Sequence, residues 1–315
     1  MGEALVVGAG VIGLSTAIRL QERGWRVRVW TADDPRDTVS CVAAAIWYPF
    51  RAYPAERVLA WSARAHAELV ALAGDPAAGI RVLEGTELWR GEEPAIWRRG
   101  ELGEVPRAPA EVVPDGYAGG QRLRVPVVEM PVYLRYLEAR LRAGGGVVER
   151  RVLAALDEAT GFPLVVNCTG LGARALLGDE TMYPIRGQVV RVENPGLDRF
   201  ALDIDPPEGA TYVVPRSGDC ILGGTAEQGS WELRPDPEVA AGIVERCLRL
   251  EPRLAGVRVL EHRVGLRPGR PAVRLEVETG SSGGRVIHNY GHGGAGVTVS
   301  WGCADEVAEL AGAPR

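Results

Sequence analysis

Two histidines and a group of glycines near the end of the sequence form a pattern that could hold a flat ligand. The segment HNYGHGGAGVTVSWG, residues 288–302, contains five glycines and leads into an expected terminal helix. Glycine loses more backbone freedom on folding than other residues, so their accumulation indicates sharp turns or a ligand lying against bare backbone. His288 and His292 could serve as bases beside such a ligand, but we expect them to hydrogen-bond the loop or the ligand instead.

A second glycine pattern lies at the start of the chain. Gly8, Gly10 and Gly13 fit the motif GxGxxG within ALVVGAGVIGLSTAIRLQERGWRVRVW, which is typical of a strand, a glycine turn, a helix and a second strand. In this unit the first glycine permits the turn, the second lets a pyrophosphate approach, and the third lets the helix pack on its strand. The sequence therefore predicts a dinucleotide site. A tight turn without a ligand is the alternative, and the motif does not choose between NAD, NADP and FAD.

An acidic residue commonly closes this unit by holding the adenosine ribose. The second strand ends in WTADDP, where Ala32 takes the usual place of the acid and Asp33 follows one residue later. Asp33 is therefore the candidate ribose ligand, and a solvated turn carboxylate is the alternative interpretation.

The composition argues against several classes of function. All 36 basic residues are arginine, so no lysine can form a Schiff base or reach the terminal phosphates of a nucleotide. A net charge of −5 disfavours a nucleic-acid or anionic-membrane surface. The five cysteines form no CxxC pair, so we expect no metal site and no disulfide framework, although a single bridge stays open. We find no signal peptide and no membrane-spanning run, which predicts a cytoplasmic protein.

The remaining elements must position the two glycine patterns. Apolar periodicity predicts a helix over 55–74, with His66 as a packed or surface residue, and another near 130–142. Residues 164–178 repeat the strand–turn–helix order of the first unit, and a succession of strands follows them. A chain of 315 residues is long for one core, so we predict two lobes.

Six segments, taken together, resemble the FAD-dependent D-amino-acid oxidases in order and spacing: VVGAGVIGLSTA, AAAIWYPF, VVNCTGLGA, RGQVVRV, GLRPGRPAVRLE and HNYGHGGAGVTVSWGCA. The resemblance spans nearly the whole chain, and its last two segments are the most specific. It implies an α/β protein with FAD as its cofactor and residues 288–298 along the flavin. A Rossmann-like FAD-binding domain on a mixed sheet is expected at residues 1–82, 126–178 and 262–315. An α+β substrate domain with a mainly antiparallel sheet is expected at residues 83–125 and 179–261.

The resemblance also implies roles for individual residues. Arg274 corresponds to the arginine that binds the substrate carboxylate, Tyr212 to a tyrosine on the same group, and the Gly294 carbonyl to the acceptor for the substrate amine. Tyr48 stands at the pocket wall, where a glutamine is common, while Arg267 and Arg270 are expected to be structural. The implied FAD contacts are Gly8, Gly10, Val11, Ile12, Gly13, Ala32, Asp33, Ser40, Ala44, Ala45, Ile46, Val152, Thr169, Gly293, Gly294, Gly296, Val297 and Thr298.

The implied reaction is oxidative deamination of a D-amino acid to a 2-oxo acid, ammonia and hydrogen peroxide, with hydride transfer from Cα to flavin N5 and dioxygen as acceptor. Glu208 stands at the position of a second tyrosine of the family. Ala226 stands where D-aspartate oxidases carry an arginine, so we expect neutral substrates. A glycine- or sarcosine-type amine oxidase and a quinone-dependent D-amino-acid dehydrogenase are the flavin-dependent alternatives. A nicotinamide-dependent dehydrogenase and a non-catalytic FAD-binding regulator are the others, and a homodimer stays open.

Overall fold

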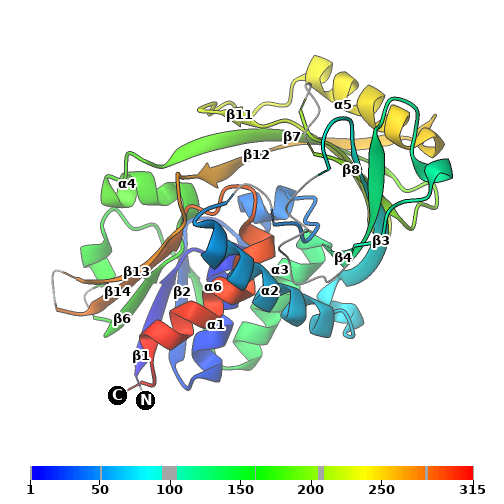
Figure 1. The fold of residues 1–315 in the computed structure, drawn as a ribbon. Coiled ribbons are helices and arrows are strands. Elements are labelled where there is room, and N and C mark those ends of the chain that lie inside the picture. The colour runs from blue at the N-terminus through cyan, green and yellow to red at the C-terminus, as the bar shows by residue number, and fades with distance from the viewer. Residues whose placement is uncertain are drawn as a thin grey trace.

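The computed structural model describes residues 2–49, 52–93, 105–159, 161–204, 209–280 and 283–314, so that Glu208 lies outside the described residues. The strands form one sheet of six and one of eight. Figure 1 shows the larger sheet curving above a group of helices that lies against the smaller one, with the two chain ends close together. The α/β class predicted from the sequence is confirmed.

The six-stranded sheet carries the first glycine motif. Its central strands are short apolar runs, and every residue of LVVN in β6 is buried, as expected for parallel strands covered on both faces. All neighbours are parallel except β13 and β14. In spatial order the strands are β13 (Arg274–Thr279), β14 (Arg285–Tyr290), β6 (Leu164–Asn167), β1 (Glu3–Val7), β2 (Arg26–Thr31) and β5 (Val147–Arg150).

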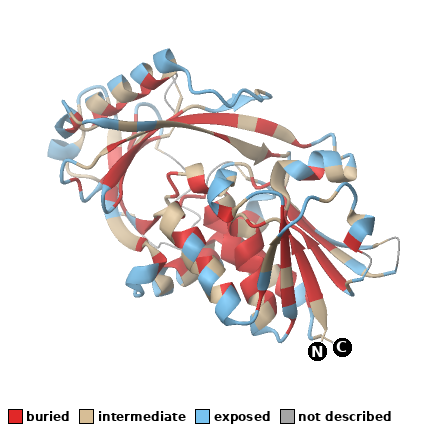
Figure 2. Ribbon diagram, turned by 180° about the vertical axis from the view of Figure 1, so that it is seen from behind, coloured by how far each residue is buried: buried red, intermediate tan, exposed pale blue. Residues whose placement is uncertain are grey.

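Four helices pack together beside this sheet, with the last helix of the chain in the middle. Eleven residues of α6 are buried, so the helix is covered nearly all round, and Figure 2 shows it as a red core. An added Cβ at Gly302 would stand 2.3 Å from the backbone of Trp61, so this glycine permits the close crossing of α6 and α2. The four helices are α1 (Val11–Glu22), α2 (Ala55–Leu72), α3 (Met130–Ala143) and α6 (Gly296–Ala311).

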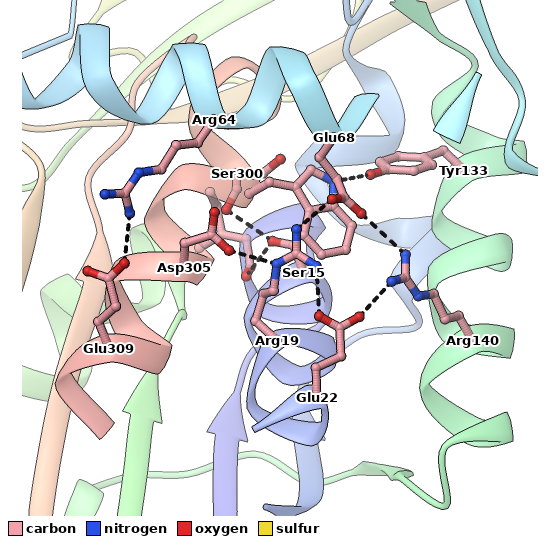
Figure 3. Close-up of polar contacts among 12 residues, drawn as sticks. Ser15, Arg19, Glu22, Arg64, Glu68, Tyr133, Arg140, Ser300, Asp305 and Glu309 are labelled. Atoms are coloured by element: carbon pink, nitrogen blue, oxygen red, sulfur yellow. Dashed lines mark hydrogen bonds and ion pairs between the residues drawn. The ribbon is translucent and has the colours of Figure 1, made fainter. Parts of the chain in front are cut away.

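A network of charged residues joins these helices (Figure 3). Arg19 on α1 contacts Glu68 on α2 at 2.6 Å and Asp305 on α6 at 2.7 Å. Its guanidinium carbon lies 4.5 Å from the ring centre of Trp301, and Arg140 of α3 approaches the same ring at 5.4 Å. The network therefore ties the helices that begin at the two glycine patterns to their neighbours.

The eight-stranded sheet is mainly antiparallel, with β3 and β8 as its parallel pair. Helix α5 (Pro237–Leu250) covers one face through an apolar cluster. Along the sheet the strands are β11 (Glu227–Gln228), β7 (Tyr183–Glu193), β10 (Asp219–Gly223), β9 (Thr211–Pro215), β8 (Phe200–Asp203), β3 (Ile80–Trp89) and β4 (Gly119–Val128), and β12 (Val259–Gly269) pairs with the other edge of β7.

Three strands of this sheet run across the domain boundaries expected from the sequence. Strand β3 begins at Ile80, β4 ends at Val128, and β12 extends to Gly269. Residues 262–269, expected in the cofactor domain, are thus hydrogen-bonded to β7 in the second sheet. In the described part of the chain, the remaining α-helix is α4 (Ala173–Leu177). Among the described residues no helix is both long and apolar enough to cross a bilayer.

Candidate active site

A cavity of about 1440 Å³ is lined by residues of both sheets. Pockets for single small ligands commonly have about 300–1,000 Å³, so this one has room for a cofactor and a substrate together. Among the described residues, the lining contains three arginines and two aspartates: Arg151, Arg267, Arg270, Asp33 and Asp37. Its lining therefore offers both basic and acidic groups to a polar ligand.

The first glycine motif lies at one end of this cavity. An added Cβ at Gly8 would stand 2.4 Å from the Cys168 carbonyl oxygen, and one at Gly13 would stand 1.9 Å from the Gly8 oxygen. Gly13 does not line the cavity, and this distance explains why the position requires glycine: helix α1 packs there on the turn after β1. Gly10 does line it, and the adjoining Val11 N–H donates to Ser40 Oγ at 3.1 Å.

An aromatic surface lies at the same end, beyond strand β2. The guanidinium carbon of Arg151 is 3.9 Å from the ring centre of Trp30, and both residues line the cavity. Ala32, Asp33 and Val152 line it as well, and all three are exposed. This arrangement of a flat stacked pair beside a carboxylate suits a base and its ribose.

Three residues of the second glycine pattern, Gly293, Gly294 and Gly296, also line the cavity. A Cβ added to Gly293 or Gly296 would have no heavy atom within 4 Å, so a side chain there would occupy the space of the cavity itself. Helix α6 starts directly after Ala295, which provides no side-chain cap. The first N–H groups of a helix have no partner within it, so they are available to a ligand.

The two histidines of this segment differ in their surroundings. His292 lines the cavity and is buried, and its Nε2 has no hydrogen-bond partner among the described residues. Burial lowers the pKa of His292 to about 3, so the ring is neutral. His288 does not line the cavity; its Nε2 lies 3.0 Å from Glu278 Oε2. The contact to Glu278 therefore joins His288 on β14 to the neighbouring strand β13.

Glycines in the second sheet make room for two polar side chains at the other end of the cavity. An added Cβ at Gly187 on β7 would stand 2.2 Å from Nη1 of Arg267 on β12. One at Gly223 would stand 1.9 Å from Cζ of the Tyr212 ring, on the neighbouring strand. Both side chains therefore lie flat over bare backbone, and both line the cavity.

Arg267 and Tyr212 meet beside the second glycine pattern. Arg267 Nη1 donates to the Thr225 carbonyl oxygen at 2.9 Å, and Arg267 Cδ stands 3.5 Å from an added Cβ of Gly294. Burial raises the pKa of Tyr212, while the charge of Arg267 and its hydrogen bond to the phenol act in the opposite direction. The phenol is therefore protonated at physiological pH and can donate a hydrogen bond.

The structure does not bring Arg274 to this site. Arg274 begins β13 in the six-stranded sheet, is absent from the cavity lining, and contacts Glu276 at 2.6 Å together with Glu278. Its Nη1 also donates to Tyr290 Oη at 2.9 Å. The expected role of Arg274 therefore needs correction, because its guanidinium is engaged by side chains of its own sheet. Arg267, which we had expected to be structural, occupies the cavity instead.

Most other predicted residues line the cavity. Thr298 Oγ1 accepts from Tyr48 N–H at 3.2 Å and donates to the Tyr48 carbonyl oxygen at 3.0 Å, which ties the wall residue to α6. Arg267 and Gly187 were not predicted as site residues. The signal for them is a glycine diagonal to an arginine on paired strands, since Arg267 pairs with Ile185, and recognising it requires the register. The predicted residues in the lining are Gly8, Gly10, Val11, Ile12, Ala32, Asp33, Ser40, Ala44, Ala45, Ile46, Tyr48, Val152, Thr169, Tyr212, Gly293, Gly294, Gly296, Val297 and Thr298.

All five cysteines are buried and carry free thiols. Burial raises the pKa of the Cys168, Cys220 and Cys247 thiols to about 12, and it raises the pKa of Cys303 well above its usual value. No disulfide joins any of them.

Comparison with known proteins decides the family. Residues 3–310 match the family model described as FAD dependent oxidoreductase, DAO. The chain belongs to this family. The D-amino-acid oxidase of Rubrobacter xylanophilus is 56% identical over 315 residues, covering 99% of this chain and 97% of the relative. That of Streptomyces coelicolor is 49% identical over 316 residues, with 98% and 97% covered. The resemblance found in the sequence is thereby confirmed.

Two further similarities are to proteins named for other activities. Human D-aspartate oxidase is 37% identical over 321 residues, covering 97% of this chain and 93% of the relative. The solved structure of glycine oxidase from Geobacillus kaustophilus has a TM-score of 0.81 at 20% identity, with 98% and 95% covered. At this identity the second similarity shows the fold alone.

The cavity fits the FAD that this family uses. Its glycine motif and the start of α1 suit a pyrophosphate, and the stacked Trp30–Arg151 pair suits an adenine. The bare backbone at Gly293 and Gly296 leaves room for a flat ring system. The buried and unpartnered Nε2 of His292 also indicates a polar ligand in the cavity.

Proposed function

We propose that this chain is an FAD-dependent oxidase of neutral D-amino acids. The observation that carries the proposal is the pairing of Arg267 with the Tyr212 hydroxyl beside the Gly294 loop, at one end of a cavity whose other end suits a dinucleotide. The high identity to two proteins named D-amino-acid oxidase supports the same conclusion. The proposed reaction yields a 2-oxo acid, ammonia and hydrogen peroxide.

In this proposal the chain acts by binding and orientation. The Arg267 guanidinium takes the substrate carboxylate, because its planar fork can form two parallel hydrogen bonds. The protonated Tyr212 hydroxyl donates a further bond to the same group, and the Gly294 carbonyl accepts from the amine. When bound, FAD accepts the hydride from Cα. No side-chain base is required, in keeping with the neutral, buried ring of His292.

The substrate end of the cavity supports a neutral side chain. Leu202, Ile204 and Ala226 line it, and none can pair with a second carboxylate. The other arginines of the lining are engaged: Arg151 stacks on Trp30, and Arg270 Nε lies 3.2 Å from Asp179 Oδ2. An acidic side chain would therefore be desolvated without a cation, which is costly.

The decisive experiment uses the purified yellow holoenzyme under nitrogen. Each D-amino acid and its L enantiomer is added in turn, and the flavin absorbance is followed. We expect neutral D-amino acids to bleach the colour, D-aspartate and D-glutamate to act far more slowly, and admitted air to restore the colour with one peroxide per turnover. Persistent colour with every D-amino acid would refute the proposal.

The rivals give different results in the same assay. A glycine- or sarcosine-type oxidase would be bleached by glycine or sarcosine in preference to larger D-amino acids. A quinone-dependent dehydrogenase would bleach but would recover its colour with a quinone rather than with air. Dioxygen as the acceptor, a homodimer and a cytoplasmic location remain parts of the proposal, and light scattering of the purified holoenzyme tests the dimer.

A further inference from the structure

A buried glutamate stands behind the wall of the substrate end of the cavity. Glu87 on β3 is 1% exposed and does not line the cavity. Its Oε1 accepts from the Tyr48 hydroxyl, and its Oε2 accepts from Gln121 Nε2 at 2.6 Å. Both carboxylate oxygens are therefore used to hold neighbouring side chains. Of the three residues, only Tyr48 reaches the cavity.

The strand register places this glutamate in line with the substrate site. Glu87 pairs with Leu202 on β8, and Leu202 pairs with Tyr212 on β9. Directly paired residues project from the same face of a sheet. Leu202 and Tyr212 both line the cavity. Since neighbouring strands lie about 4.8 Å apart, Glu87 stands roughly 10 Å from Tyr212 along this row.

Tyr48 is fixed at its other end by the last helix. Its backbone exchanges two hydrogen bonds with Thr298, in the first turn of α6. Tyr48 thus links two parts of the site. Its backbone contacts α6 at the cofactor end, and its hydroxyl contacts Glu87 in the second sheet. With both ends held, its side chain is fixed in the wall of the cavity that Tyr212 and Arg267 also line.

We propose that Glu87 is a positioning residue that sets side-chain specificity by holding the Tyr48 ring against the substrate side chain. The inference rests on the proposed function, in which Arg267 and Tyr212 hold the carboxylate and the side chain extends along the row toward Tyr48. Small side chains end before this wall, whereas branched and aromatic ones contact it. Glu87 thereby affects large substrates more than small ones.

The same strands provide a matched control on the opposite face. Tyr117 donates to Asp203 Oδ2 at 2.8 Å, and Asp203 is 2% exposed. Asp203 pairs with Leu88, the residue after Glu87, so the two carboxylates project from opposite faces of the sheet. Neither Tyr117 nor Asp203 lines the cavity. Tyr117→Phe therefore removes the same kind of tyrosine–carboxylate hydrogen bond as Tyr48→Phe, but on the opposite face of the sheet.

The test measures kcat/KM of the holoenzyme for D-leucine and for D-alanine, and compares their ratio between variants. Tyr48→Phe and Glu87→Gln should each lower the D-leucine to D-alanine ratio about threefold to tenfold, the scale of one net hydrogen bond. The change should reside in KM for D-leucine. The double variant should show no more than the larger single effect, because Glu87 acts through Tyr48. Tyr117→Phe should leave the ratio within about twofold of the original.

Several results would overturn the inference. The first is an additive change of the D-leucine to D-alanine ratio in the double variant. The second is an equal loss of kcat/KM for both substrates, and the third is an equal shift of the ratio in Tyr117→Phe. If Glu87→Gln does not yield a yellow protein, Gln121→Met tests the same network from the other oxygen and should move the ratio in the same direction. An unaltered protein that oxidises no D-amino acid refutes the proposed function and this inference together. Active variants with an unchanged ratio refute only the inference.

Discussion

Replacing Arg267 by methionine tests the core of the proposed site. The substitution keeps an unbranched side chain over Gly187 but removes the charge and every N–H donor. A hydrogen bond to a charged group contributes about 1.5–3 kcal/mol, and a carboxylate held by the fork accepts two. One nitrogen already serves the Thr225 carbonyl, so we take the lower half of this range, about 3–4 kcal/mol in total. Arg267→Met should then lower kcat/KM for D-alanine by about two to three orders of magnitude.

Arg274→Met is the matched control for this variant. Arg274 pairs with Glu276 and Glu278, whose side chains are 56% and 51% exposed, and such surface pairs contribute about 0–1 kcal/mol. We expect its kcat/KM to stay within about twofold of the unaltered enzyme. The assay is peroxide release across a D-alanine series, with flavin content measured on the same samples. A large loss in Arg274→Met together with a small loss in Arg267→Met would refute our placement of the carboxylate.

Three further predictions concern stability. Ala45 has a φ of 55°, in the left-handed region. Ala45→Gly should therefore raise the free energy of unfolding by about 0.5 kcal/mol, because the relief of backbone strain exceeds the entropy that glycine loses on folding. A denaturant titration that shows a lower free energy of unfolding would contradict this. Burial acts to raise the pKa of Asp179, but hydrogen bonds from Thr181, Tyr290 and Arg270 outweigh it and lower the pKa to about 2. A lowered carboxyl pKa adds stability above pH 4 that is lost as the pH falls toward 2. Between these pH values the free energy of unfolding should therefore fall by about 2 kcal/mol more in the unaltered protein than in Asp179→Asn. Parallel curves of stability against pH would count against the assignment. Arg19→Met should cost about 2 kcal/mol because it leaves Glu68 and Asp305 without their shared cation, whereas Arg64→Met, at an exposed pair with Glu309 (Figure 3), should cost about 0.5 kcal/mol or less in the same titration.

The sequence predicts the cofactor end of the site better than the substrate end, and the reason is distance along the chain. Gly8, Gly10 and Gly13 act within one strand–turn–helix unit, so their spacing alone indicates their function. The glycines at 293 and 296 are equally local, since they lie just before and at the first residue of α6. Motifs of this kind can be recognised without knowledge of the tertiary structure.

The error at Arg274 and the unexpected place of residues 262–269 in the second sheet have one cause. Arg267 and Arg274 are seven positions apart and both lie in strand-like sequence, yet β12 joins the second sheet and β13 the first. Which arginine reaches the cavity depends on the pairing of β12 with β7, and on Gly187 lying where the guanidinium needs space. That pairing spans about eighty residues of sequence, which local periodicity does not report. The Glu87–Tyr48 contact was missed for the same reason.

The burial of all five cysteines has a consequence under the proposed function, in which peroxide forms within the fold. Peroxide attacks the thiolate rather than the thiol, and burial keeps at least four of these sulfurs protonated far beyond neutral pH. Even Cys168, in the wall of the chamber where peroxide would form, is held in its unreactive state. Under the proposed function these four thiols are thereby protected from the product of the reaction.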